Sequence, residues 1–255
     1  MRAVRSLMAL AGALALLSGC AFGSIAGTNS VRPPDKPPLE AIKFALSQLD
    51  TMPYSYDMLT DGFTVQVRGG FDTAKKSLHY QVYKDEKFAK KELKVYAEYV
   101  VIGPDNYLWD SETGRTTNEW PKDKWLHFDA RRAPKFDVFA SGQLKGGFAA
   151  WVKGILSVER TGVNTYKGRF DLTKINASQD KLKRFPDGGK SVPFEAATDT
   201  HGLLSQFRYT TPAQGTQKET KETIWIRDKG VPLELKVPDP KNTVPATQRM
   251  YDLFK

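Results

Sequence analysis

The sequence predicts a mainly β protein of the α+β class, built on an antiparallel sheet. Apolar and polar residues alternate with a period of two in several segments between residues 63 and 238, which is the pattern of strands with one buried face. Turn residues join these segments into hairpins, and the gaps leave no room for the crossover helices that parallel strands need. A helical repeat of apolar residues precedes the first strand, and a second one interrupts the series.

Residues 1–19 have the order of a secretory signal peptide. Arg2 and Arg5 precede an apolar run that ends at residue 17. As a helix this run spans about 16 Å, roughly half of the hydrocarbon core of a bilayer, so a permanent membrane span is not expected. Residues 17–20, Leu-Ser-Gly-Cys, resemble the bacterial lipobox, which implies cleavage before Cys20 and a lipid anchor on its sulfur. The alternative is a lone buried Cys20 at the edge of an ordinary signal peptide.

The segment that follows is read as a tether. Residues 20–38 begin with the lipidated Cys20 and end in a proline-rich stretch, and extended polyproline of this length reaches up to about 50 Å. Cys20 is the only cysteine in the chain, so the domain that follows cannot form an internal disulfide and depends on its core for stability. By length alone, the mature part, residues 20–255, suits one large domain or two small ones.

A helix is predicted at the start of this domain. Apolar residues recur at helical spacing between Leu39 and Leu49, and Pro38 suits the first turn of a helix. We expect the helix to end before Pro53.

Strands follow from the alternation and from turn chemistry. Alternating segments lie at residues 63–68, 78–83 and 93–101, and Gly-Pro-Asp-Asn at 103–106 reverses the chain into a strand at 107–109. Three further hairpins are expected in residues 156–172, 194–210 and 222–238, with turns at 162–164, 199–202 and 228–230.

The second helical repeat occupies residues 133–156. Gly142, Gly146 and Gly147 would each destabilise a helix by about 1 kcal/mol, so two short helices are expected rather than one long one. The apolar residues of this repeat would form a stripe along one side of the helices. In the simpler interpretation this stripe packs against the sheet, and in the other it lines a ligand pocket. Its members are Phe136, Phe139, Ala140, Leu144, Phe148, Trp151 and Ile155.

The sequence offers little catalytic or metal-binding chemistry. The three histidines, His79, His127 and His201, have no ligand spacing, and phosphate-loop, nucleophile-elbow and zinc-protease motifs are absent. Asp-rich turns could hold an acid/base pair, but the sequence cannot show two carboxylates converging. We therefore expect no enzyme activity, no metal and no cofactor.

The charge pattern indicates a solvated surface. The formal net charge is +9 and falls to +7 without Arg2 and Arg5. Basic residues are mostly mixed with acidic ones, although attraction to anionic lipid headgroups or envelope polymers is a second interpretation. Nucleic acid is not an expected partner for a protein held outside the membrane.

Five segments, taken in order, resemble the LppX/LprG-like bacterial lipoproteins and, more distantly, the LolA/LolB lipoprotein carriers. They are VVIGPDNYLWD, WLHFDARR, VERTGVNTYKGRFDLTKI, ATDTHGLLSQFRY and DKGVPLELKVPDP. The resemblance implies that residues 39–255 form one curved antiparallel half-barrel sheet of about ten strands, with helices covering its concave face.

The resemblance also implies that acylated ligands bind between the sheet and its helical cover. The alternative for each residue is ordinary core packing. Cover residues would be Phe136, Phe139, Leu144, Phe148 and Trp151, and strand residues would be Phe63, Val65, Tyr99, Val101 and Phe170.

These expectations describe a monomeric, membrane-anchored, extracytoplasmic lipoprotein that binds, and could transfer, lipids or acylated molecules of the cell envelope. The alternative is a non-catalytic lipoprotein that docks another envelope protein.

Overall fold

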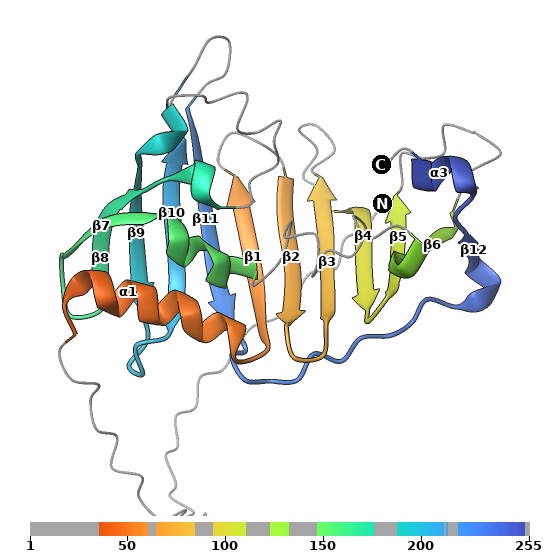
Figure 1. Cartoon of the computed structure of the whole chain (residues 1–255), viewed down its shortest axis with the longest axis horizontal. Coiled ribbons are helices and arrows are strands. Elements are labelled where there is room, and N and C mark those ends of the chain that lie inside the picture. The colour runs from red at the N-terminus through yellow and green to blue at the C-terminus, as the bar shows by residue number, and fades with distance from the viewer. Residues whose placement is uncertain are drawn as a thin grey trace, which may run out of the picture. The chain divides into compact units, whose positions relative to one another are not determined.

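The computed structural model of the 255-residue chain (Figure 1) describes residues 36–60, 65–84, 94–110, 123–132, 147–175, 188–211, 213 and 219–252. The predicted signal peptide 1–19, Cys20 and all of the tether before residue 36 lie outside these residues. The predictions for that part of the chain therefore stay predictions.

Within the described residues, twelve strands form one sheet, and the fold is mainly β with few helices. The strand order is β12-β6-β5-β4-β3-β2-β1-β11-β10-β9-β8-β7. The strands are β1 (Tyr54–Thr60), β2 (Val65–Asp72), β3 (Ser77–Lys84), β4 (Lys94–Ile102), β5 (Asp105–Asp110), β6 (Trp125–Asp129), β7 (Ile155–Arg160), β8 (Thr165–Phe170), β9 (Val192–Thr198), β10 (Leu204–Thr211), β11 (Thr220–Arg227) and β12 (Thr243–Pro245).

The sheet is mixed, which corrects the expectation of a purely antiparallel sheet of about ten strands. β12 pairs with β6 in parallel, whereas the other paired strands are antiparallel. A strand as short as β12 carries too few residues to show alternation, so the sequence gives no sign of it.

The predicted N-terminal helix is confirmed. Helix α1 (Pro38–Ser47) begins with Pro at its first position and carries Glu40 in its first turn, where a negative charge favours the helix dipole. It continues into the 3₁₀ helix η1 (Gln48–Asp50) and ends before Pro53. Its buried side chains are Ile42, Ala45 and Leu46, with Leu49 added from η1.

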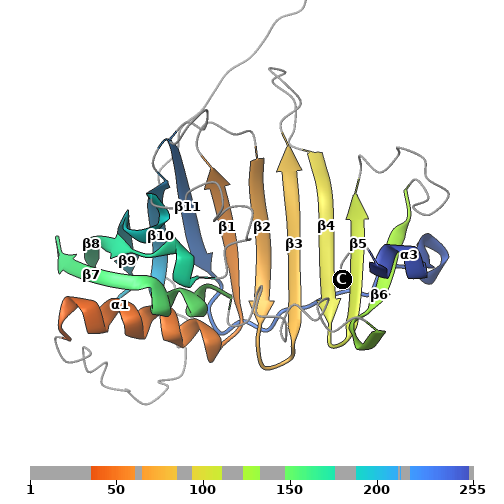
Figure 2. The same cartoon turned by 45° about the horizontal axis from the view of Figure 1, so that its top comes forward.

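The second helical region is described only in part, because residues 133–146 lie outside the description. The described part is a 3₁₀ helix, η5 (Gly147–Gly154), and Ile155 begins β7 rather than continuing the helix. Helices α1 and η5 contact each other and lie at the β7–β11 end of the sheet in both views (Figures 1 and 2), where α1 contacts β7 and β10. Helices α1 and η5 therefore cover the β7–β11 part of the sheet, and a cover over the whole concave face is not confirmed.

The prediction of a hairpin at residues 222–238 is wrong. The chain does turn at Asp228 and Gly230, which both have positive φ, but residues 231–239 form no strand. The position beside β11 is taken by β1 on one side and by β10 on the other. Residues 231–239 instead lead to the 3₁₀ helix η8 (Pro240–Asn242), β12 and helix α3 (Gln248–Asp252).

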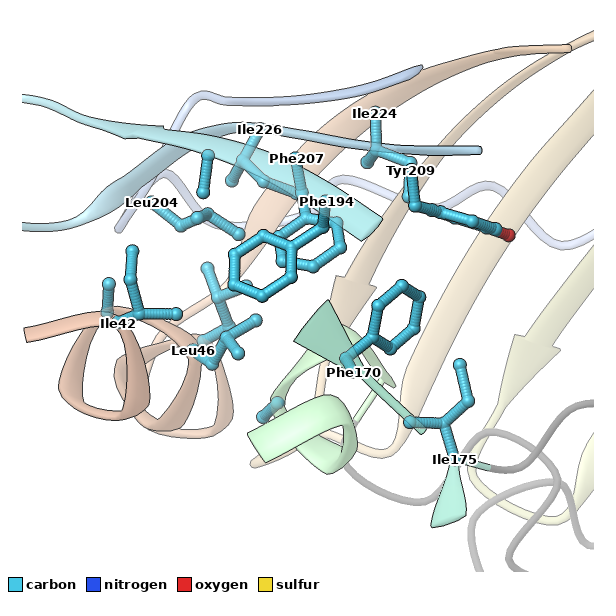
Figure 3. Close-up of a cluster of buried hydrophobic side chains, with 14 of the residues drawn as sticks. Ile42, Leu46, Phe170, Ile175, Phe194, Leu204, Phe207, Tyr209, Ile224 and Ile226 are labelled. Atoms are coloured by element: carbon cyan, nitrogen blue, oxygen red, sulfur yellow. The ribbon is translucent and has the colours of Figure 1, made fainter. Parts of the chain in front are cut away.

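Two hydrophobic clusters stabilise the domain. The main cluster joins α1 and η5 to strands from both halves of the sheet, and Figure 3 shows Ile42 and Leu46 of α1 near Phe194 and Phe207. The second cluster lies where β12 and α3 pack on β6. Its buried members are Leu126, Phe128, Ala246, Met250 and Tyr251.

Candidate functional site

The side chains that face α1 and η5 define the inner face of the sheet, and strand register arranges them in rows. Residues paired across neighbouring strands lie within side-chain contact of one another. The first inner row is buried along its whole length. It contains Tyr54, Phe71, Leu78, Val101, Asn106 and Phe128.

The second inner row is buried only in part. Tyr56, Tyr80 and Leu108 are half-buried, although Tyr99 between them is buried. The row runs from β1 to β6 as Tyr56, Gly69, Tyr80, Tyr99, Leu108 and Leu126.

The third inner row changes its exposure along its length. On β10 and β11, Phe207 and Ile224 are each 1% exposed beneath the helical cover. Beyond β11 the row continues through apolar side chains that are all half-buried, namely Met58, Val67, Val82 and Ala97. An apolar surface therefore extends past the covered core across β1–β4. We call it the apolar shelf and define it as Tyr56, Met58, Val67, Tyr80, Val82 and Ala97.

Aromatic residues of η5 border the apolar shelf. The Phe148 ring meets the Tyr56 ring edge-on at 5.1 Å and the Trp151 ring edge-on at 5.1 Å. The Trp151 ring then stacks on Phe170 at 6.1 Å. Offset and edge-on pairs of this kind add stability beyond the area that they bury. The Phe148 N–H donates to the Tyr54 hydroxyl at 3.3 Å and fixes the start of η5 on β1.

Tyr54, Tyr56 and Tyr80 are uncharged at neutral pH. Burial raises the pKa of Tyr56, with smaller contributions from Tyr54 and Tyr80. Burial also raises the pKa of Tyr54, although the Phe148 N–H opposes it, and the pKa of Tyr80. Their rings therefore add uncharged surface to the apolar shelf and its border.

A polar pair marks one end of the inner face. Glu222 is buried on β11 beside Thr60 of β1, and the Tyr209 hydroxyl donates to its carboxylate. Burial and the neighbouring Glu222 carboxylate raise the pKa of Tyr209 well above its ordinary value. The apolar side chains of β10 and β11 thus give way to hydrogen-bonded polar groups at this end.

The structure brings together part of the predicted ligand-binding set. Phe148 and Trp151 are half-buried on η5, and Phe170 beside them is 0% exposed. Tyr99 and Val101 lie on the inner face of β4 and are 6% and 1% exposed. All five are packed with the main core, and their role as ligand contacts stays a prediction.

The other predicted contacts are not described in full. The backbone of Val65 in β2 pairs with Lys84 in β3, but the side chain of Val65 lies outside the described part of the chain. The remaining predicted contacts, which lie outside it altogether, are Phe63, Phe136, Phe139 and Leu144.

Sequence reasoning missed the β1 contribution to the apolar shelf. The segment Tyr54–Thr60 alternates Tyr54, Tyr56 and Met58 with Ser55 and Asp57, so a period-two search extended to this segment would have found the strand. Residues of β3 were assigned to a strand, but Tyr80 and Val82 were not selected as site residues.

The described residues hold no group of three or more His, Cys, Asp and Glu side chains that could bind a metal ion. His79 pairs with Glu98 at 2.7 Å and His127 pairs with Asp105 at 2.8 Å, each as an isolated pair. None of the helices in the described ranges is long and apolar enough to cross a membrane.

No protein-family model and no curated protein matches the sequence. Among solved structures, LprF from Mycobacterium bovis is similar over 78% of this chain and 96% of its own, at 10% identity and a TM-score of 0.46. An uncharacterized conserved protein from Thermus thermophilus is similar over 81% of this chain and 97% of its own, at 8% identity and a TM-score of 0.39. At these scores neither likeness establishes a family.

Proposed function

We propose that this chain is a membrane-anchored, extracytoplasmic lipoprotein of the LppX/LprG-like type that binds the acyl chains of lipids or acylated molecules on the apolar shelf. The third inner row carries the proposal, because its apolar side chains pass from fully buried Phe207 and Ile224 to half-buried Met58, Val67 and Val82. A row of apolar side chains left partly accessible beside a covered core is a surface suited to an apolar ligand.

The binding energy comes from apolar area and requires no reaction. An alkyl chain that buries about 300 Å² of apolar surface gains about 7.5 kcal/mol before the loss of its own freedom of motion is counted. Neutral Tyr56 and Tyr80 rings and the branched Val67 and Val82 side chains supply contact on the protein side. Such a site holds and releases a ligand without a catalytic group.

The docking alternative depends on exposed apolar side chains, and these are distributed over separate elements. Among the described residues the large exposed hydrophobic side chains lie on β1, on the β7–β8 hairpin and in segment 231–239. They are Leu59, Leu156, Val163, Val231 and Val237. We therefore favour acyl binding.

The test uses the chain from residue 21 onward and the fluorescent fatty acid cis-parinaric acid. Val82→Glu places a charge in the apolar shelf, and we expect it to weaken probe binding at least about tenfold, because a carboxylate must be desolvated when the alkyl chain binds. Gln81→Glu is the matched control, since Gln81 follows the opposite parity of β3 and points to the other face.

The control variant should bind the probe as the unchanged chain does, and circular dichroism should show both variants folded. Mass spectrometry of an organic extract of protein purified from its native host would identify a bound acylated molecule. Equal binding by the two variants, or an unchanged chain that binds neither probe nor lipid, contradicts the proposal.

A further inference from the structure

The outer face of the sheet, which is turned away from α1 and η5, has a pocket of about 530 Å³ over β7–β11. Most of the side chains that line it alternate along each strand with core residues. On β8, for example, Lys167 and Arg169 are exposed, whereas Tyr166 and Phe170 are buried. The pocket and the apolar shelf therefore occupy opposite faces of one sheet.

One row of charges across the pocket is balanced. Register aligns Glu159, Lys167, Glu195 and Arg208 on four successive strands. The Lys167 ammonium lies 2.6 Å from the Glu159 carboxylate, and the Arg208 guanidinium lies 3.3 Å from the Glu195 carboxylate. These four side chains neutralise one another.

The neighbouring row has cations without carboxylates. In this row Ser157, Arg169 and Pro193 are paired across β7, β8 and β9. Thr210 of β10 is paired with Lys221 of β11. Within the described part of the chain, no carboxylate lies within ion-pair distance of Arg169 or Lys221. The pocket thus carries two uncompensated positive charges.

Arg169 is held in place by hydrogen bonds that leave part of its guanidinium free. Its Nε donates to the Ser191 hydroxyl at 2.6 Å, and its Nη2 donates to the Ser191 carbonyl. A guanidinium positioned in advance loses less freedom when it binds an anion. The Nη1 group makes no hydrogen bond within the described part of the chain and is available as a donor.

We propose that the pocket binds a phosphate group between Arg169 and Lys221, with the Thr210 hydroxyl as a further donor. The β8 and β11 backbones are separated by three strand spacings, or about 14 Å, so the two long side chains can converge from opposite sides. Pro193 and Thr210 lie between them and are short enough to leave space for the anion. Arginine and lysine are the side chains that bind phosphate best.

The phosphate could belong to an anionic phospholipid headgroup at a membrane surface or to a soluble phosphomonoester. Both sources present the same group to the pocket. Because the pocket and the apolar shelf lie on opposite faces, this inference goes beyond acyl binding and stands even if the chain binds no acyl ligand.

The test compares two double variants with equal net charge. Arg169→Gln with Lys221→Gln removes the uncompensated cations, whereas Lys153→Gln with Lys174→Gln removes two exposed cations outside the pocket. Calorimetry with inorganic phosphate and glycerol 3-phosphate measures soluble anions. Cosedimentation with phosphatidylcholine vesicles, with and without phosphatidylglycerol, measures the headgroup.

We expect the unchanged chain to bind the soluble anions, the phosphatidylglycerol vesicles or both. The Arg169→Gln, Lys221→Gln variant should bind the same probe at least about tenfold more weakly. The control variant should lose no more than about twofold. Glu195→Gln should strengthen binding, because it removes a carboxylate from the pocket. Equal loss in the two double variants, or no binding by the unchanged chain in either arm, overturns the proposal.

Discussion

Asp199 shows at the scale of one residue how the β9–β10 turn is attached to the rest of the sheet. Its Oδ1 accepts from the backbone N–H groups of His201 at 2.9 Å and Leu203 at 3.0 Å, and its Oδ2 lies 2.6 Å from the Lys229 ammonium. Burial alone would raise its pKa, but Lys229 and the two N–H groups outweigh burial and hold the pKa of Asp199 below 3.8. The ionised carboxylate thus links this turn to the turn that follows β11.

The change Asp199→Asn keeps an acceptor for the two N–H groups and removes the charge. We expect a loss of about 1 kcal/mol in the free energy of unfolding at neutral pH, measured by urea denaturation. The folded pKa lies below the unfolded one, so the stabilisation is present above about pH 4 and disappears as the pH falls through the folded value. The difference between variant and unchanged chain should therefore shrink in acid.

A double-mutant cycle with Lys229→Gln assigns this effect. If the Asp199–Lys229 pair is responsible, the double variant should be less destabilised than the sum of the single variants. A difference that stays constant down to about pH 3 would show that the charge of Asp199 is not involved.

Residue exposure on the inner face was the least predictable property of the candidate site. The alternation of side chains along each strand predicted that Tyr99, Val101 and Phe170 face inward, and all three are buried on the inner face. Alternation along a strand does not show whether an inward-facing residue lies under a helix or beyond it. Met58 and Ile224 are paired neighbours in one row, yet Met58 is half-buried and Ile224 is covered, because the position of α1 and η5 decides their exposure.

At the scale of elements, local chemistry predicted hairpins well where a turn joins neighbouring strands. The β7–β8 and β9–β10 hairpins form as expected. The prediction failed after β11, where Pro232 and Pro238 interrupt the alternating segment. Proline lacks the N–H that a sheet requires, and both sides of β11 are already filled, one by the preceding strand β10 and the other by the distant strand β1. Strand order depends on contacts that no local pattern contains.

Close packing between strands gives a prediction for Gly168 of β8. A Cβ atom there would overlap the Ser157 carbonyl oxygen on β7 and the Phe194 ring, and neither backbone nor buried ring can move freely. We expect Gly168→Ala to lower the free energy of unfolding by about 1–3 kcal/mol, measured by urea denaturation.

Gly162→Ala in the same hairpin is the control. Its Cβ would meet the Thr165 hydroxyl oxygen, the end of an exposed side chain that can rotate away. The control should change stability by less than about 0.5 kcal/mol. Equal effects at the two positions would show that the β7–β8 contact is not tightly packed.

At the scale of the whole molecule, the proposed anchor decides where the domain acts. Cys20→Ala should abolish incorporation of labelled fatty acid, because the thiol that would carry the lipid is missing, and should shift the protein from the membrane to the soluble fraction. Ser24→Ala lies outside the lipobox-like residues and should leave labelling unchanged. Persistent labelling of the Cys20 variant would refute the anchor.

The mainly β class was the part of the architecture that the residue pattern predicted best, whereas the single sheet was implied by the family resemblance. Alternation is a property of each strand and survives any change in strand order. The parallel β12–β6 pair and the second hydrophobic cluster around Phe128 and Tyr251 were not predicted. Both depend on where segment 231–239 leads the chain after it leaves β11.

The pairing of β1 with β11 also affects how the chain is made. About 160 residues separate these strands, and at about 5–20 residues per second a ribosome needs roughly ten to thirty seconds to add them. During that time β1 keeps a free edge that other chains can join. The nascent chain therefore has to be shielded from aggregation until its last long strand emerges.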